Sequence, residues 1–465
     1  MRASFEEFSK QKHACQSNFC SFCLNLLTKR LTDCCNCDIV NRMANRKKLL
    51  IISDAVSSNT GFGRIARDLS VRINANLSDV YELATAGFGS PGSNKYPWQQ
   101  YYLEGVKDWV IPTLPQICDD FFGGEEGIVW FIWDLSRLTW FSQPMMFREL
   151  TDGYPGLQEW LLKQKFQKWI YLPVDGSGPN DKFTFPLMRA LYGFDRILAY
   201  TQFGEDVVRR SIGDMDADAR HLTNLPHGID SEVFYETNRK RCRRLLFQYT
   251  GASTGKMMRG ASRIPDPIKD NECLIGIFCT NQSRKDWHLG IQVASLIAKE
   301  RPIRLLCHTD GLERAWSIPS LLADYGILDQ AIISTGTIGD DKMAQAYSSC
   351  DLTLAIGLGE GMGFPIFESM FCGTPVLHGD YAGAPEYLAE RSYGKRIPSD
   401  NEPFLVKPIG FHAEGCYSFK RPVFDPEDWA KKATSLIGKR VNHCGELDWN
   451  VLWQRWEIYL RKAAQ

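Results

Sequence analysis

Short apolar runs alternate with amphipathic stretches along the first half of the chain. Leu49–Ala55 is an apolar run of strand length, and a polar loop rich in serine and glycine follows it. In Arg64–Asn76 apolar residues recur at helical spacing, which predicts a helix with one buried face. Further apolar runs lie at Gly127–Trp133, Lys168–Pro173 and Asp195–Tyr200. The alternation of strands and helices favours an α/β domain with a mostly parallel sheet.

The second half of the chain repeats this alternation. The apolar run Cys273–Cys279 is followed by a polar loop and by the amphipathic stretch Trp287–Lys299. Later strands are predicted at Ile303–His308, Ile332–Thr335, Leu352–Ile356 and Thr374–Leu377. Because parallel sheets bind ligands at the carboxyl ends of their strands, two Rossmann-like halves that face a cleft suit a nucleotide ligand.

Composition sets the expected domain limits. A chain of 465 residues is long enough for two or three domains. The residues between the two halves are rich in Arg, Lys, Gly and Pro, which predicts a linker. We expect a leader at 1–46, a Rossmann-like domain at 47–235, a linker at 236–271, a second Rossmann-like domain at 272–445 and a terminal helix at 446–465.

Charge and hydropathy narrow the classes of partner. The 54 basic and 55 acidic residues nearly cancel, so the whole chain has no general attraction to nucleic acid or anionic lipid. No run of about 18 apolar residues occurs, so no transmembrane helix is expected, and peripheral contact with a membrane stays open.

The cysteines are distributed unevenly. Nine are scattered, several of them in apolar runs, which indicates reduced core residues and a cytoplasmic protein. No convincing signal peptide is present. Six cluster near the start of the chain, at Cys15, Cys20, Cys23, Cys34, Cys35 and Cys37. We interpret the leader as disordered or non-native and expect a protein that begins at Met43 to fold and function. A zinc knuckle is the alternative, although this spacing is irregular for zinc.

The segment 359–375 carries the most chemical information. Pro365 suits the first position of a helix and Gly373 the position just after its end, which predicts a helix at 365–372. The glycines before it, Gly361 and Gly363, let the backbone approach a ligand and aim N–H groups at it. With the neighbouring Met362 and Phe364, they form a helix N-terminus suited to a diphosphate.

Two carboxylates flank this anion site. Glu368 lies one turn into the helix, where it can bind both hydroxyls of a ribose. Glu360 precedes the glycines and can reach the sugar beyond the phosphates. In the other loop of this half, Arg284 and Lys285 stand just before a helix, where they can neutralise a leaving diphosphate.

This segment closely resembles the signature of retaining GT-B glycosyltransferases of the family 4 type, in which two glutamates flank seven residues. The resemblance covers about 49–465 and includes the strand at 351–355, the stretch 375–380 and a crossover at 226–230. It implies a GT-B fold, two Rossmann-like domains facing a cleft with a C-terminal helix that returns to the first domain. It also implies that 47–235 is the acceptor side and 272–445 the donor-binding side. The family has an earlier arginine in the loop of Arg284, where this chain has Cys279 or Thr280.

The first glycine loop supports an alternative. Gly61 and Gly63 match a dinucleotide fingerprint and Glu82 follows about 20 residues later, as in a nicotinamide-dependent oxidoreductase. The resemblance instead assigns this loop to the cleft, near the donor phosphates. Asp134 and Asp175 each follow a predicted strand, where a carboxylate can orient an acceptor hydroxyl or cap the chain.

For a lone histidine at a strand end, as at His227 and His308, we favour a structural role.

The resemblance implies transfer of a sugar from a UDP- or GDP-sugar to an acceptor hydroxyl, with retention and without a bound metal or other cofactor. The nucleobase of the donor is expected near Ile338. The acceptor stays open among glycans, lipid-linked glycans, small molecules and modified nucleic acid. A non-catalytic sugar-nucleotide binding module is the third hypothesis.

Overall fold

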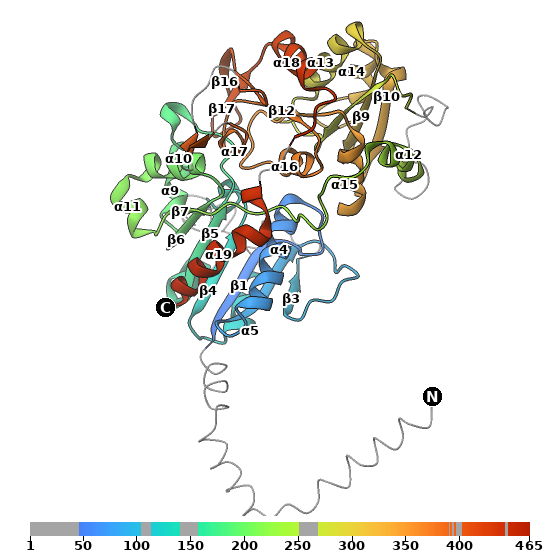
Figure 1. Ribbon diagram of the computed structural model, residues 1–465. Helices are drawn as coiled ribbons and strands as arrows, with labels where there is room; N and C mark the ends of the chain where they lie inside the picture. The colour runs from blue at the N-terminus through green and yellow to red at the C-terminus, as the bar shows by residue number, and fades with distance from the viewer. Residues whose placement is uncertain are drawn as a thin grey trace, which may run out of the picture.

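The computed structural model describes residues 46–103, 113–139, 157–250, 268–389, 391–392, 395–396, 402–441 and 445–465. These residues form two α/β domains, drawn in blue to green and in yellow to red in Figure 1. The predictions for the cysteine-rich leader, including its alternative as a zinc knuckle, lie outside the described residues.

The N-terminal domain is built on a seven-stranded parallel sheet in the order β3-β2-β1-β4-β5-β6-β7. Its strands are β1 (Lys47–Asp54), β2 (Tyr81–Phe88), β3 (Gln99–Tyr102), β4 (Gly127–Ile132), β5 (Gln167–Leu172), β6 (Arg196–Ala199) and β7 (Thr223–Asn224). Its helices are α4 (Gly61–Asn76), α5 (Leu114–Phe122), α8 (Leu157–Lys163), α9 (Phe185–Leu191), α10 (Gln202–Ile212) and α11 (Asp214–Ala219), with short turns η2 (Leu135–Leu138) and η3 (Pro179–Asp181).

The C-terminal domain is built on a six-stranded parallel sheet in the order β10-β9-β8-β11-β12-β15. Its strands are β8 (Cys273–Phe278), β9 (Ile303–Thr309), β10 (Ala331–Thr335), β11 (Leu352–Ala355), β12 (Val376–Gly379) and β15 (Leu405–Val406). Its helices are α13 (Trp287–Glu300), α14 (Ile318–Asp324), α15 (Asp340–Ser349), α16 (Phe364–Phe371), α17 (Pro385–Leu388) and α18 (Pro426–Leu436), with short turns η4 (Leu328–Gln330) and η5 (Gly445–Leu447). Two small hairpins are β13 (Arg391–Ser392) with β14 (Lys395–Arg396), and β16 (Gly410–Glu414) with β17 (Phe419–Val423).

The central strands form because their apolar runs are buried on both faces of the sheet, as a parallel sheet covered by helices requires. In β4 every residue is buried, and in β1 the five residues Leu49 to Ser53 are buried. The predicted strands of both halves are therefore present, within a few residues of the expected limits. This confirms two Rossmann-like domains.

The terminal helix α19 (Trp449–Ala464) returns to the first domain, as predicted (Figure 1). The indole N–H of Trp456 donates to the carbonyl of Pro226 at 2.9 Å, and Tyr81 donates to the carbonyl of Leu460 at 2.7 Å. Trp456 is fully buried against Trp130 of β4. One face of α19 is therefore part of the core of the N-terminal domain.

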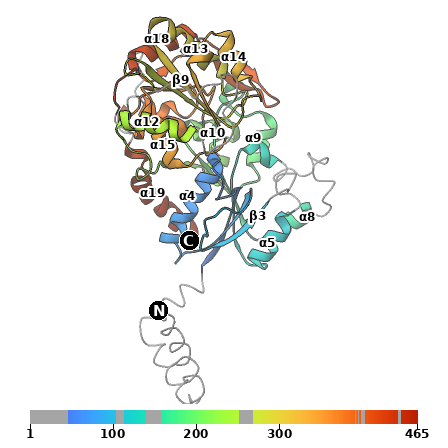
Figure 2. The same ribbon diagram turned by 90° about the vertical axis from the view of Figure 1, so that its right-hand side faces the viewer.

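The predicted linker at 236–271 differs from the structure in its first half. Residues Arg239–Thr250 form helix α12, which packs on α15 and appears beside it in Figure 2. Arg239 donates to Asp351 at 2.7 Å, and Arg243 donates to the carbonyl of Ser349 at 2.9 Å. This part of the basic run is therefore not a solvated connector, because Arg239 and Arg243 are bound to acceptors of the C-terminal domain.

Candidate active site

A cavity of about 760 Å³ lies between the two domains and is lined by the carboxyl ends of strands from both sheets. The N-terminal domain contributes Asp54, Asp134 and Asp175, at or just beyond the ends of β1, β4 and β5. The C-terminal domain contributes residues at or just beyond the ends of β8, β9 and β10, namely Cys279, Thr280, His308, Thr309 and Gly336. The cleft predicted from the strand pattern is therefore present.

Helix α16 begins at this cavity. Gly363 caps it with a φ of 90°, a left-handed conformation that favours glycine, and Pro365 stands in its first turn. The helix starts one residue before the predicted position, and Gly373 follows its end with a φ of 73°. All four residues predicted for the anion site line the cavity: Gly361, Met362, Gly363 and Phe364.

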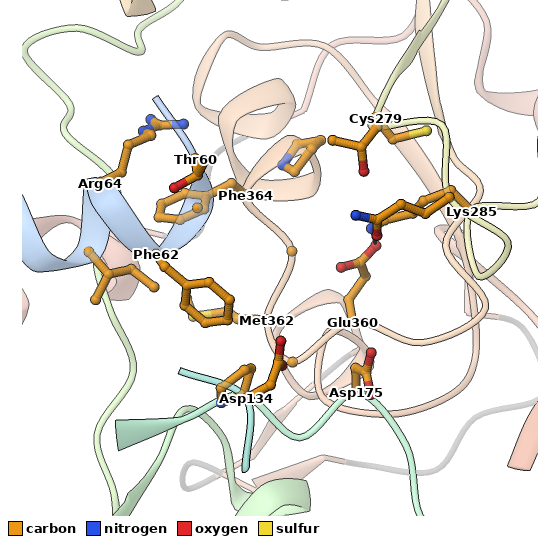
Figure 3. A pocket seen from close by; sticks show the side chains of 18 of the residues that line it. Thr60, Phe62, Arg64, Asp134, Asp175, Cys279, Lys285, Glu360, Met362 and Phe364 are labelled. Carbon is orange, nitrogen blue, oxygen red and sulfur yellow. Dashed lines mark hydrogen bonds and ion pairs between the residues drawn. The ribbon is translucent and has the colours of Figure 1, made fainter. Parts of the chain in front are cut away.

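Glu360, Lys285 and Arg284 form one ion-pair network in the cavity. Lys285 bonds the Glu360 carboxylate directly, and Figure 3 shows the two side chains pointing toward one another. Arg284 lies 3.6 Å from the same carboxylate. Burial by itself would raise the pKa of Glu360, but the charges of Lys285 and Arg284 outweigh it and hold this pKa at about 2. Burial and the charge of Arg284 lower the pKa of Lys285, and Glu360 opposes this effect. The structure thus brings three of the predicted site residues together in one coupled network.

Glu368 is buried at the side of the cavity, with 2% of its side chain exposed. Its two carboxylate oxygens are bonded by Arg64 at 2.5 Å and by the hydroxyl of Tyr347 at 2.9 Å. Arg64 belongs to α4 of the other domain, and its guanidinium lies 4.5 Å from the centre of the Phe364 ring. Arg64, which was not predicted from the sequence, therefore stands between the cavity and Glu368, the residue predicted to bind ribose.

Ile338 lines the C-terminal end of the cavity with Gly336 and Thr337, beyond strand β10. His308 lies beside them, with its ring nitrogen Nδ1 3.0 Å from the hydroxyl of Ser334. Burial lowers the pKa of His308 to about 4. The ring is therefore neutral at physiological pH and is held by a neighbour, as a structural histidine would be.

His227 also has the surroundings of a packing residue. Its ring is 2% exposed and lies 4.3 Å from that of Phe364 and 5.2 Å from that of Tyr200. Burial lowers its pKa to about 3, so it carries no charge in the cleft.

The two glycines of the first loop have different surroundings. Gly61 lines the cavity opposite the Phe364 ring. Gly63 is not among the lining residues. A Cβ atom there would lie 2.7 Å from the carbonyl of Ala55 and 2.8 Å from that of Ser58, so Gly63 serves the close packing of α4 on the preceding loop.

The nicotinamide alternative fails on the position of Glu82. This residue pairs with Lys48 at the amino-terminal end of the sheet and forms an ion pair with Arg46 at 3.8 Å. A ribose-binding acid of a dinucleotide fold stands at the carboxyl end of the second strand. Glu82 is therefore at the wrong end of β2 to complete the fingerprint, because sequence spacing alone does not show where a strand starts.

Asp134 and Asp175 lie together at the N-terminal wall of the cavity, below Glu360 in Figure 3. Desolvation by the surrounding cleft walls raises the pKa of Asp134 to about 6, although 44% of its side chain is exposed, and the neighbouring charge of Asp175 adds to this effect. Asp175 lies 3.6 Å from Arg284 and 3.5 Å from Arg421. Asp134 is thus less firmly paired than Asp175.

Sequence reasoning missed Arg64, Tyr347, Asp54 and Arg421, which stand in or beside the cavity. Arg64 directly follows the first glycine loop, so its position was the one available signal. Arg421 comes from β17, far beyond the glutamate segment, and no local pattern indicates that it turns back to the cleft.

A protein-family model described as glycosyl transferases group 1 matches residues 273–409. The match spans the second sheet from β8 to β15 and includes Arg284, Lys285, Glu360 and Glu368. Over these residues the chain is therefore similar to the glycosyl transferases of group 1, and its two facing Rossmann-like domains form a GT-B fold.

Curated relatives match this GT-B chain over short segments. The chain is 36% identical over 81 residues to the serotype-specific mannosyltransferase WbdA of Escherichia coli, which is 17% of this chain and 10% of that protein. It is 26% identical over 100 residues to the D-inositol 3-phosphate glycosyltransferase of Mycobacteroides abscessus, 22% of each chain. The matches thus span well under half of the relatives' own length.

Solved structures match over most of the chain and show the fold. The sucrose-phosphate synthase of Thermosynechococcus elongatus superimposes with a TM-score of 0.60 at 14% identity, covering 90% of this chain and 100% of the other. HepE of Anabaena, in complex with UDP and glucose, does so with a TM-score of 0.57 at 13% identity and the same coverage.

Within the part of the chain that the structure describes, no three His, Cys, Asp or Glu side chains are grouped so as to hold a metal ion. Metal independence stays a prediction. None of the described helices is both long and apolar enough to cross a membrane.

Proposed function

We propose that this protein transfers a glycosyl group from a UDP- or GDP-sugar to an acceptor hydroxyl, with retention of configuration and without a metal, as enzymes of the family 4 type do. The observation that carries the proposal is the convergence of Arg284, Lys285 and Glu360 on the N-terminus of α16 inside one interdomain cavity. Support also comes from HepE, whose solved complex contains UDP and glucose.

The donor would lie along the C-terminal wall. Its base would contact the loop at Ile338 and its ribose Glu368, and its diphosphate would bind the N–H groups that precede α16. Arg284 and Lys285 would stabilise the charge of the leaving diphosphate, and Glu360 would bind the sugar. Because Glu368 is almost fully buried beneath Arg64, ribose binding requires that Arg64 shift.

In the proposed reaction the bond between the anomeric carbon and the diphosphate oxygen breaks, and the diphosphate departs with the electron pair. The acceptor oxygen forms the new bond on the same face of the sugar. The acceptor's proton passes to an oxygen of the departing diphosphate. The protein's contribution is therefore electrostatic and positional, since no protein nucleophile takes part.

A panel of UDP- and GDP-sugars tests the proposal. The purified full chain is incubated with each donor, and release of the nucleoside diphosphate is measured with and without a mixture of sugars, glycosides and polyols. Turnover of at least one donor, lost in Lys285→Met and kept in Lys299→Met, is expected. Lys299 is an exposed residue of α13 and serves as the matched control. Binding of a donor without any turnover would instead favour the non-catalytic binding module.

A further inference from the structure

The hairpin β16–β17 follows the segment that matches the family model, which ends at residue 409. It reaches from the C-terminal domain to the N-terminal one. The backbone N–H of Lys420 donates to the carbonyl of Ser177 at 2.7 Å, and the Lys420 ammonium lies 2.8 Å from Asp181. The hairpin is therefore fastened to the loop that follows β5.

Arg421 makes a second, buried attachment at the same place. Its side chain is 5% exposed. It donates to the carbonyl of Asp175 at 2.8 Å and to Glu414, across the hairpin, at 2.7 Å. The Asp175 carboxylate lies 3.5 Å away. Two carboxylates thus neutralise this arginine and hold the hairpin against the end of β5.

The hairpin also brings an aromatic ring into the cleft. Phe419 lines the cavity, and its ring meets that of Phe183 edge-on, with 6.3 Å between the centres. Phe62 lines the same cavity from the first glycine loop. A pocket with aromatic walls and a few fixed polar groups is typical of small-molecule recognition.

The charged groups at this end of the cavity are already paired with one another. Its described lining residues include three carboxylates, Asp54, Asp134 and Asp175, and three arginines, Arg137, Arg284 and Arg421. Arg284 lies 3.6 Å from Asp175 and 3.6 Å from Glu360. Arg421 is already bound by Glu414, and Arg137 lies 3.8 Å from Asp54 and 3.9 Å from Asp134. A phosphate group placed here would meet carboxylates, and a like charge in a cleft is strongly disfavoured.

We propose that the space between Asp134, Asp175 and the β16–β17 hairpin is the acceptor subsite, and that it takes a neutral, hydroxyl-rich ring such as a sugar without phosphate. The inference rests on the proposed function and names its acceptor class. The Asp134 side chain is 44% exposed and has room for hydroxyl donors. Phe419 would pack on the C–H face of the ring.

Two alanine variants of the hairpin test the placement. Phe419→Ala should raise the KM for a neutral sugar acceptor about tenfold, the loss expected for a removed aromatic contact. Phe411→Ala is the control, because this side chain lies on the same hairpin and is 52% exposed. Equal acceptor KM values for Phe419→Ala and the unaltered protein, with matched melting temperatures, would overturn the placement.

Matched acceptor pairs test the charge. Transfer to glucose and mannose is compared with transfer to glucose 6-phosphate and mannose 6-phosphate, with the donor that the panel identifies. The neutral sugar should have a kcat/KM at least tenfold higher than its phosphate. A preference for the phosphate, or donor turnover without transfer to any neutral sugar, glycoside or polyol, would overturn the inference while the glycosyltransferase proposal stands. Absence of any donor binding or turnover would defeat both.

Discussion

The two walls of the cleft have the same architecture but carry different charged groups at their strand ends. Each wall consists of the carboxyl ends of parallel strands and the loops after them. The C-terminal wall carries Arg284 and Lys285 beside the N-terminus of α16, whereas the N-terminal wall carries Asp54, Asp134 and Asp175. A shared fold therefore does not set the ligand; the side chains at the strand ends do.

In the proposed function, this contrast would assign the donor and the acceptor to different walls of the cavity. Cations and helix N–H groups favour a diphosphate on one side. Carboxylates favour neutral hydroxyl donors on the other side and disfavour a second anion. Glu360 lies where the two walls meet. It is bound to Lys285 of the C-terminal wall, and Arg284 lies 3.6 Å from Glu360 and 3.6 Å from Asp175 of the N-terminal wall. The predictions below test each wall in turn.

The largest effect is expected at Lys285. Lys285→Met removes a buried cation from the C-terminal wall. We expect turnover of the sugar nucleotide to fall by about 10²–10³-fold, as when one group that stabilises a developing charge is removed. The measurement is kcat with saturating donor. The variant leaves Glu360 buried beside a single cation, so Lys285→Met/Glu360→Gln is made in parallel to keep the fold. A kcat within threefold of the unaltered protein in a folded variant would contradict the role.

Glu368→Gln should weaken donor binding by about 1–3 kcal/mol, the usual cost of a lost charged hydrogen bond. The physical reason is that a neutral amide binds the ribose hydroxyls less strongly than a carboxylate does. Isothermal titration with the matching nucleoside diphosphate measures this. Glu427→Gln, at an exposed position of α18, is the control. Unchanged affinity in Glu368→Gln would remove the ribose assignment.

A smaller effect is expected on the pH dependence of the acceptor KM, through Asp134 of the N-terminal wall. The pKa of Asp134 is raised to about 6, so the carboxylate is charged above that pH and gains a proton below it. The neutral acid is a poorer acceptor of a hydroxyl hydrogen bond. The acceptor KM should therefore rise by up to about tenfold per unit as the pH falls below 6. Asp134→Asn has no such titration, and its acceptor KM should stay flat over this range. The same rise in both proteins would assign it to another group.

The smallest expected effect is that of EDTA, which should leave the transfer rate unchanged, because the proposed stabilisation of the diphosphate comes from Arg284, Lys285 and α16. The rate is measured before and after dialysis against the chelator. Loss of transfer with recovery on addition of Mn²⁺ would show that the reaction needs a metal. Asp134 and Asp175 would then become candidate metal ligands.

Much of this comparison could be predicted from local sequence. The strands were visible as apolar runs, since a parallel sheet covered by helices buries both faces of its strands. Helix α16 was visible from Pro365 and Gly373. The residues proposed to bind the sugar nucleotide could be predicted because they stand in two short contiguous segments, around Arg284 and between Glu360 and Glu368.

The tertiary structure alone decided the contacts between distant segments. The ion pairs of Arg64 with Glu368 and of Arg421 with Asp175 join residues of different domains, at 2.5 and 3.5 Å. No local period in the sequence encodes which side chains two packed domains bring into contact. The same reason explains why helix α12 was predicted as a linker. Its basic sequence is typical of a solvated segment, and only the tertiary structure shows that Arg239 binds Asp351. It also explains Glu82, whose spacing fits a dinucleotide site but whose strand begins at the opposite end of the sheet. Spacing along the chain determined the elements and their anion site, and packing between the domains determined what faces that site.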